Sequence, residues 1–105
     1  MIFEVKAMAI TCGKVIENFI AGVKESEDGS VSSTKTVKIK GDQLIHYSTP
    51  IMERDEEGFI LNISRYSLAT GQLQKRMKEL LPAGYRIVRR VPENYNNSLK
   101  DFLEK

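Results

Sequence analysis

The side chains that could do chemistry are concentrated in a short acidic stretch near the middle of the chain. Four carboxylates lie within five residues there: Glu53, Asp55, Glu56 and Glu57. Clustered carboxylates can hold a divalent cation, but a calcium loop places its oxygen ligands at alternating positions. This stretch, which runs directly into Gly58, lacks that spacing. We therefore expect a solvated loop at a hairpin tip, whose four carboxylates could contact a protein partner.

The residues for nucleophilic or metal chemistry are too few for a site. The chain has one cysteine, Cys12, and one histidine, His46, whereas a structural zinc ion needs four nitrogen or sulfur ligands. Cys12 is expected to be a small, half-buried apolar side chain, and His46 a strand residue. Capping and strand-face hydrogen bonds account for four hydroxyl residues that lack a basic partner, Ser48, Ser64, Ser67 and Thr70. The sequence therefore predicts no enzyme, no cofactor and no metal.

Basic residues gather in the second half of the chain. Residues 59–91 hold seven basic residues and one acidic residue, a net +6, while the remainder carries −4. This asymmetry predicts a basic side and an acidic side; the alternative is two solvated faces without a partner. The basic residues that could contact the phosphates of a nucleic acid are Lys75, Arg76, Lys78, Arg86, Arg89 and Arg90.

A hairpin and a helix should position both charged sets. Residues 44–51 and 59–63 are two β-rich runs around the acidic loop, which predicts an antiparallel hairpin. Pro50 cannot donate to a ladder, so its strand should be an edge or be interrupted there. Asn62 and Ser64 alternate with Ile63, which predicts one wet face on the second strand.

The helix should begin at Ser67 or Thr70, both of which can cap a helix, and end at Pro82–Gly84. Its apolar stripe is Leu73, Met77, Leu80 and Leu81, and Lys75, Lys78 and Glu79 lie opposite. A last strand with a basic face is expected over residues 85–91. A short helix capped by Ser98 should follow.

The first forty residues give weaker signals. Residues 2–10 read as a strand, and Thr11 can cap a following helix. The apolar residues between 15 and 23 fit one stripe of a helix, but their β-branched content leaves a bent strand open. Residues 31–40 predict a half-buried strand with Val37 and Ile39 on its inner side.

Two short patterns stand out, Tyr47-Ser-Thr-Pro-Ile51 and, at the strand-to-helix junction, Leu61-Asn62 with Tyr66-Ser67 and Thr70. These segments resemble small proteins of phages and mobile elements, a family without an assigned activity. The resemblance covers residues 14 to about 81. The family follows its Tyr-Ser pair with two threonines and a histidine, of which only Thr70 is present here. The resemblance implies a compact α+β fold and a phage or mobile-element origin.

Together these signals predict a single α+β domain over residues 1–105. We expect a small antiparallel sheet of four or five strands with one principal amphipathic helix packed on it. The helix stripe should cover four sheet residues, Ile45, Phe59, Leu61 and Ile87. No apolar run approaches the ~20 residues of a membrane span, and no secretory leader is evident, so we expect no membrane partner and a cytoplasmic location in a bacterial host.

The sequence is compatible with two functions. The first is a phage-type accessory protein that binds and inhibits a host protein of the nucleic-acid machinery, as an anti-CRISPR protein does. Its contact would be the acidic loop Glu53–Glu57 or the acidic loop Glu25–Asp28. The second is direct nucleic-acid binding through the basic residues of 75–90, with Tyr66 or Tyr85 to stack on bases. No sequence-reading motif supports the second, and the pI of 8.7 is below that of most such domains. A homodimer formed through an open sheet edge is a further possibility.

Overall fold

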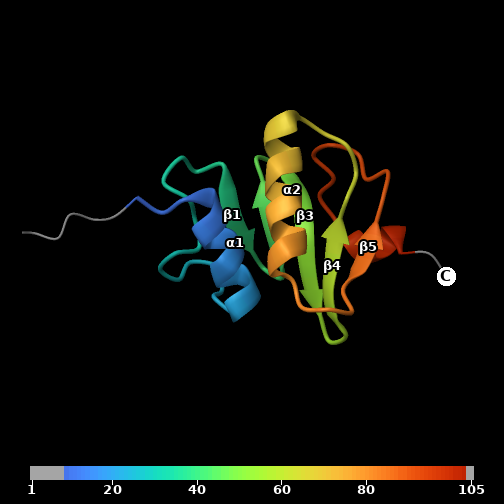
Figure 1. The fold of residues 1–105 in the computed structure, drawn as a ribbon, viewed down its shortest axis with the longest axis horizontal. Coiled ribbons are helices and arrows are strands. Elements are labelled where there is room, and N and C mark those ends of the chain that lie inside the picture. Colours follow the sequence, from blue (N-terminus) through green and yellow to red (C-terminus); the bar gives the residue numbers. More distant parts are fainter. Residues whose placement is uncertain (1–8, 104–105) are drawn as a thin grey trace, which may run out of the picture.

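The computed structural model describes residues 9–103, which form one sheet, two α-helices and a 3₁₀ helix (Figure 1). The elements in chain order are α1 (Cys12–Ala21), β1 (Val37–Lys40), β2 (Gln43–His46), β3 (Thr49–Asp55), β4 (Gly58–Asn62), α2 (Leu68–Leu80), β5 (Arg86–Val88) and η1 (Leu99–Phe102). The strand expected over residues 2–10 falls outside the described residues, apart from residues 9 and 10, which are not in a strand.

The expected α+β class is confirmed, but the sheet is mixed rather than antiparallel. The strands lie in the order β1-β2-β3-β4-β5, and the first four pair antiparallel. β5 pairs parallel to β4, because α2 crosses over the sheet and returns the chain to the end where β4 began. The sequence predicts the helix, but it does not show at which edge of the sheet the chain pairs again after the helix. The parallel pairing of β5 with β4 was therefore not predicted.

The segment that the sequence left open between helix and strand is the helix α1. Thr11 caps it as expected, its hydroxyl accepting from Lys14 N at 3.0 Å. Gly22 ends the helix at φ 108°, in the left-handed region that glycine adopts without strain. A β-branched stripe therefore does not prevent a helix here, because Val15, Ile16 and Phe19 are all fully buried.

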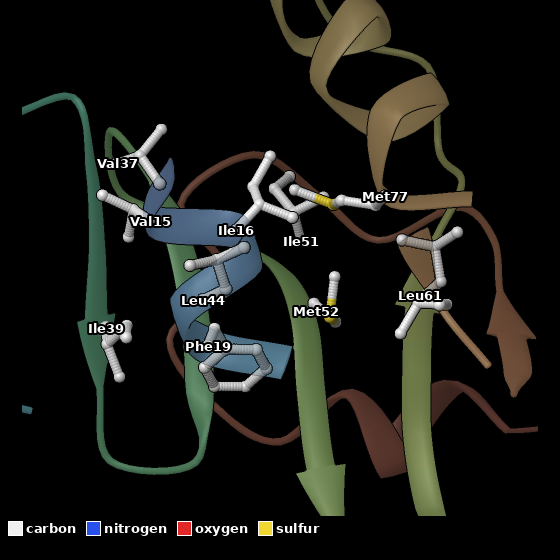
Figure 2. Packing of buried hydrophobic residues seen from close by; sticks show 11 residues of the cluster. Val15, Ile16, Phe19, Val37, Ile39, Leu44, Ile51, Met52, Leu61 and Met77 are labelled. Carbon is white, nitrogen blue, oxygen red and sulfur yellow. The ribbon is translucent and has the colours of Figure 1, made fainter. Parts of the chain in front are cut away.

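The two helices lie side by side on one face of the sheet, α1 over β1 and α2 over β4 (Figure 1). Figure 2 shows Ile16 and Phe19 of α1 and Met77 of α2 among apolar side chains of β1 to β4. The buried set is Val15, Ile16, Phe19, Val37, Ile39, Leu44, Ile51, Met52, Leu61, Met77 and Leu81. The sequence predicted one principal helix, whereas both helices supply this core.

Two of the expected contacts for α2 are wrong. Ile87 lies on β5, at the edge of the sheet, and stays 38% exposed. Ile45 pairs with Lys38, while its neighbour Leu44 pairs with Ile39 in the core, so Ile45 faces away from the helices. Phe59 packs partly against the core. The helix stripe itself is confirmed, with Met77 and Leu81 buried and the other two leucines half-buried.

The single hairpin expected over residues 44–63 is in fact two. Tyr47 and Ser48 form a tight turn between β2 and β3, with Tyr47 at φ 59° and 66% exposed. Pro50 lies in β3, an inner strand, beside a register shift at Leu44 and Ile45. The expected interruption is therefore confirmed and the edge position is wrong, because the shift accommodates the missing donor.

The second face of the sheet is covered as well, by the chain after β5. Val91, Leu99 and half-buried Phe102 pack there on Ile60 and Val88. The wet face expected at Asn62 and Ser64 is therefore wrong, since both residues are buried. Asn62 donates to Pro50 O and Tyr66 Oη at 2.9 Å each, and Ser64 Oγ accepts from Val91 N at 2.8 Å.

Candidate binding surfaces

The acidic stretch does not form the solvated loop that the sequence predicts. β3 extends to Asp55, and only Glu56 and Glu57 remain in the turn before β4. Side chains alternate along a strand, so Glu53 and Asp55 point away from the helices. Arg54 points toward the helices, where it donates to the Phe19 carbonyl at the end of α1 and lies 4.5 Å over the Phe19 ring.

Glu53 is buried, with 6% of its surface exposed, and binds the C-terminal segment. Its Oε2 accepts from Ser98 Oγ at 2.6 Å, and its Oε1 accepts from Leu99 N at 2.7 Å. Gln43 donates to Glu53 Oε1 at 3.0 Å and to the Asn97 carbonyl at 2.9 Å. A buried carboxylate with these donors holds the start of η1 on the sheet. Glu53 is thus a structural residue and is not presented to a partner.

Asp55 is used internally too. Arg86 of β5 donates to both of its carboxylate oxygens, at 2.5 and 3.0 Å. The hydrogen bonds from Arg86 lower the pKa of Asp55 below its usual value, and Asp55 raises the pKa of Arg86. This bidentate pair ties the end of β3 to β5, on the far side of β4.

Glu56 and Glu57 are the two carboxylates of the stretch that face solvent. Their side chains are 85% and 76% exposed, and cations lie near both. Lys100 Nζ is 4.0 Å from Glu56, and Arg86 Nη1 is 3.7 Å from Glu57. Arg86 is shared between Asp55 and Glu57, so two cations face three carboxylates, and the turn keeps one uncompensated negative charge. This is weaker than the acidic contact surface that the sequence predicts.

The six predicted basic residues separate into two groups. Arg76 is paired with Glu17 and Glu79 at 3.5 Å each, and Arg86 with Asp55. The other four are exposed and make no ion pair with the described residues: Lys75, Lys78, Arg89 and Arg90. Lys75 and Lys78 lie about one turn apart on the exposed side of α2, as predicted. The last strand, expected over residues 85–91, ends at Val88, so Arg89 and Arg90 lie in the chain that directly follows it.

A groove of about 630 Å³ runs along β5, where Arg89 and Arg90 lie. Its lining is Tyr85, Arg86, Ile87, Val88, Arg89, Arg90, Phe102 and Leu103. Among residues 9–103, its lining holds three arginines and no acidic residue. Among residues 9–103, no strand pairs with β5 on the side away from β4 (Figure 1). The sequence indicated a basic strand here, but it gave no signal that Phe102 and Leu103 would join it.

His46 lies in a second polar cluster, at the start of α2. His46 Nδ1 is 2.8 Å from Thr70 Oγ1, which is 3.1 Å from Ser67 Oγ. His46 is a buried strand residue, as expected, and burial lowers its pKa. Ser67 accepts from Thr70 N as the cap of α2. The expectation that Thr70 lacks a basic partner is therefore wrong, since His46 lies within hydrogen-bond distance of it. No carboxylate among residues 9–103 hydrogen-bonds His46 to orient it as a base.

A further groove of about 640 Å³, which the sequence did not indicate, lies on the face of the sheet away from the helices. β1 and β2 line it through Lys38, Lys40 and Gln43, and the segment 94–98 closes its other side. Glu25 and Asp42 also line it, so its lysines face a comparable acidic charge. It carries no sign of one class of partner, unlike the groove along β5.

Comparisons with known proteins name no relative. No family model, no curated protein and no solved structure matches the chain. Neither α1 nor α2, the α-helices of residues 9–103, has the length and apolarity to cross a membrane. In the same part of the chain, no three histidine, cysteine or acidic side chains converge as metal ligands would.

Proposed function

We propose that this chain is a non-enzymatic accessory protein of a phage or mobile element that binds a host protein. It acts in the cytoplasm of the bacterial host, and its contact surface is the arginine-lined edge of β5. Inhibition of an enzyme of the host nucleic-acid machinery, as an anti-CRISPR protein inhibits its target, is the concrete form of this function. The acidic turn is not the contact surface.

The proposal rests on which charged side chains are paired within the protein and which face solvent. Glu53 and Asp55 are held by Ser98, Leu99 and Arg86, so half of the acidic stretch has no surface to offer. Arg89 and Arg90 line a groove in which no acidic residue from the described part of the chain, residues 9–103, balances them. Uncompensated exposed charge raises the rate at which an oppositely charged partner is captured.

The test is a pull-down from nuclease-treated bacterial lysate with the tagged chain and two charge-matched variants. R89E/R90E and K75E/K78E each lower the formal net charge from +2 to −2. We expect a stoichiometric host protein to be retained by the parent and by K75E/K78E, and lost by R89E/R90E. Recovery of no stoichiometric protein, or equal recovery by all three, contradicts the proposal.

Direct nucleic-acid binding is the second candidate, because Lys75 and Lys78 point into solvent on one side of α2. Phosphate contacts by such lysines give affinity that falls steeply with salt. A mobility shift at low salt that weakens at physiological salt and is lost in K75E/K78E favours this function. The absence of a shift at both salt concentrations rules it out.

A further inference from the structure

β5 leaves part of its backbone without a partner among residues 9–103. Ile63 N donates to Val88 O at 2.9 Å, so the carbonyl of Val88 points toward β4. Successive residues of a strand direct their backbone groups to opposite sides. The N–H and C=O of Ile87 therefore point away from β4, toward the groove that β5 lines. Such an edge can pair with an extended chain.

The side chains around this edge select the chemistry of the chain that pairs with it. Arg89 and Arg90 are exposed beside the edge, and carboxylates are the side chains that match a guanidinium best. Phe102 and Leu103 are half-buried in the same groove, and Ile87 is 38% exposed. These three would cover apolar side chains. The groove thus suits an extended segment in which acidic and apolar residues alternate.

A second copy of this chain fits the edge poorly. An isologous pairing of β5 with β5 would bring Arg86, Arg89 and Arg90 of one copy near those of the other. Like charges directly across a strand pair destabilise it. Charge thus disfavours a homodimer through this edge and favours a partner strand of opposite charge.

We infer that β5 accepts an acidic, extended segment of the partner protein as a sixth strand of the sheet. The inference rests on the proposed function, since it names how the partner is bound. The backbone of Ile87 supplies the main-chain hydrogen bonds, Arg89 and Arg90 supply the charge, and Phe102 with Leu103 supplies the apolar contact.

The probe is a terminally blocked peptide of about eight residues, the length of an ordinary strand, in which glutamate and valine alternate. Two control peptides have the same length. In the first, lysine replaces glutamate. In the second, backbone nitrogens on both edges of the extended peptide are N-methylated, so that neither edge can pair with β5. Chemical-shift titration of the full chain should move the amides of Ile87 and Arg89 with the glutamate peptide. The lysine peptide and the N-methylated peptide should leave both amides in place.

Variants of the chain test the two parts of the site separately. R89E/R90E should bind the glutamate peptide about tenfold or more weakly than K75E/K78E, which has the same net charge. Ile87→Pro should abolish binding, because proline cannot donate and its ring blocks the edge, while Ile87→Thr should retain it. The N-methylated peptide tests the same contact if the proline variant does not fold.

Equal binding of the methylated and unmethylated peptides overturns strand addition, since charge alone would then hold the peptide. Failure of the glutamate peptide to bind also overturns strand addition. So does an oligothymidine that moves the amides of Ile87 and Arg89 when the glutamate peptide does not. In each case the lysate experiment decides separately on the proposed function. A host protein retained by the parent and lost by R89E/R90E would leave that function standing without the sixth strand.

Discussion

Residues 53–57 and 86–90 are both short charged stretches in the sequence, but the fold uses them in opposite ways. In the first, Glu53 is buried and Asp55 is paired with Arg86, so its charges bind the protein to itself. In the second, only Arg86 is used internally, while Arg89 and Arg90 face a groove. The surroundings of a charged residue in the fold, and not its neighbours in sequence, determine whether it can meet a partner.

The largest expected loss of folding stability comes from placing a carboxylate where no hydrogen-bond donor surrounds it. Glu53 is stable in the interior because Ser98, Leu99 and Gln43 donate to it. Met77 is 1% exposed in an apolar core, so Met77→Asp should cost at least about 3–5 kcal/mol. That is from about one fifth to all of the stability of a typical domain, about 5–15 kcal/mol.

Urea unfolding followed by circular dichroism measures this loss. Met77→Leu is the matched control, and a swap that conserves volume should cost less than about 1.5 kcal/mol. A Met77→Asp variant that unfolds at the same urea concentration as the parent would contradict the packing of α2 on the sheet.

The next largest effect comes from changing the buried carboxylate itself. Glu53→Gln replaces one acceptor oxygen by a donor, which leaves a buried donor of Ser98 or Leu99 unsatisfied at a cost of about 1–3 kcal/mol. The loss should be local, so the Leu99 amide should exchange with deuterium faster while the core amides of α2 change less. Glu57→Gln, in the exposed turn, should alter neither. An unchanged Leu99 amide in Glu53→Gln would show that the carboxylate does not hold η1.

Asp55→Asn should have a smaller effect, about 1–2 kcal/mol at pH 7, because the pair with Arg86 loses its charge but keeps one hydrogen bond. The pH dependence has a definite sign. The pKa of Asp55 is lowered from 3.8 in the folded state, so its contribution is present above pH 3.8 and is lost as the pH falls through the folded value. Acid unfolding of parent and variant should therefore converge at low pH. A difference that persists undiminished there would rule out the charge pair as its source.

The smallest expected effect on stability comes from the titration of His46. Burial lowers its pKa from 6.5, so the folded protein takes up a proton less readily than the unfolded chain. Its contribution to stability is complete above pH 6.5 and falls as the pH is lowered from 6.5 toward the folded pKa. His46→Gln should remove this part of the pH dependence of the thermal midpoint. A parent protein with the same midpoint at pH 7.5 and pH 5 would contradict the prediction.

Local signals in the sequence predicted the helix caps and α2 well, although they left α1 open between a helix and a bent strand. Thr11, Ser67 and Ser98 each cap the helix that they were expected to cap, since capping depends on residues three or four positions away. The stripe containing Met77 was predicted for the same reason. These features depend on neighbouring residues, which a sequence displays directly.

The sheet was predicted less well because its faces are defined by distant segments. An alternating strand shows which side is polar, but not what covers that side. Glu53, Asn62 and Ser64 looked solvated, and each is buried. The chain after β5 supplies hydrogen-bond partners to Glu53 from Ser98 and Leu99, and to Ser64 from Val91. Asn62 bonds to Pro50, Ser64 and Tyr66. Their polar type indicated neither the cover nor the partners.

The most direct test of the account is the comparison of R89E/R90E with K75E/K78E in the nuclease-treated lysate. Both variants carry the same net charge, and neither changes a buried residue, so both should unfold at the parent's midpoint. We predict that K75E/K78E retains a stoichiometric host protein and that R89E/R90E loses it. Retention by R89E/R90E with loss by K75E/K78E would contradict the account and place the contact surface on α2.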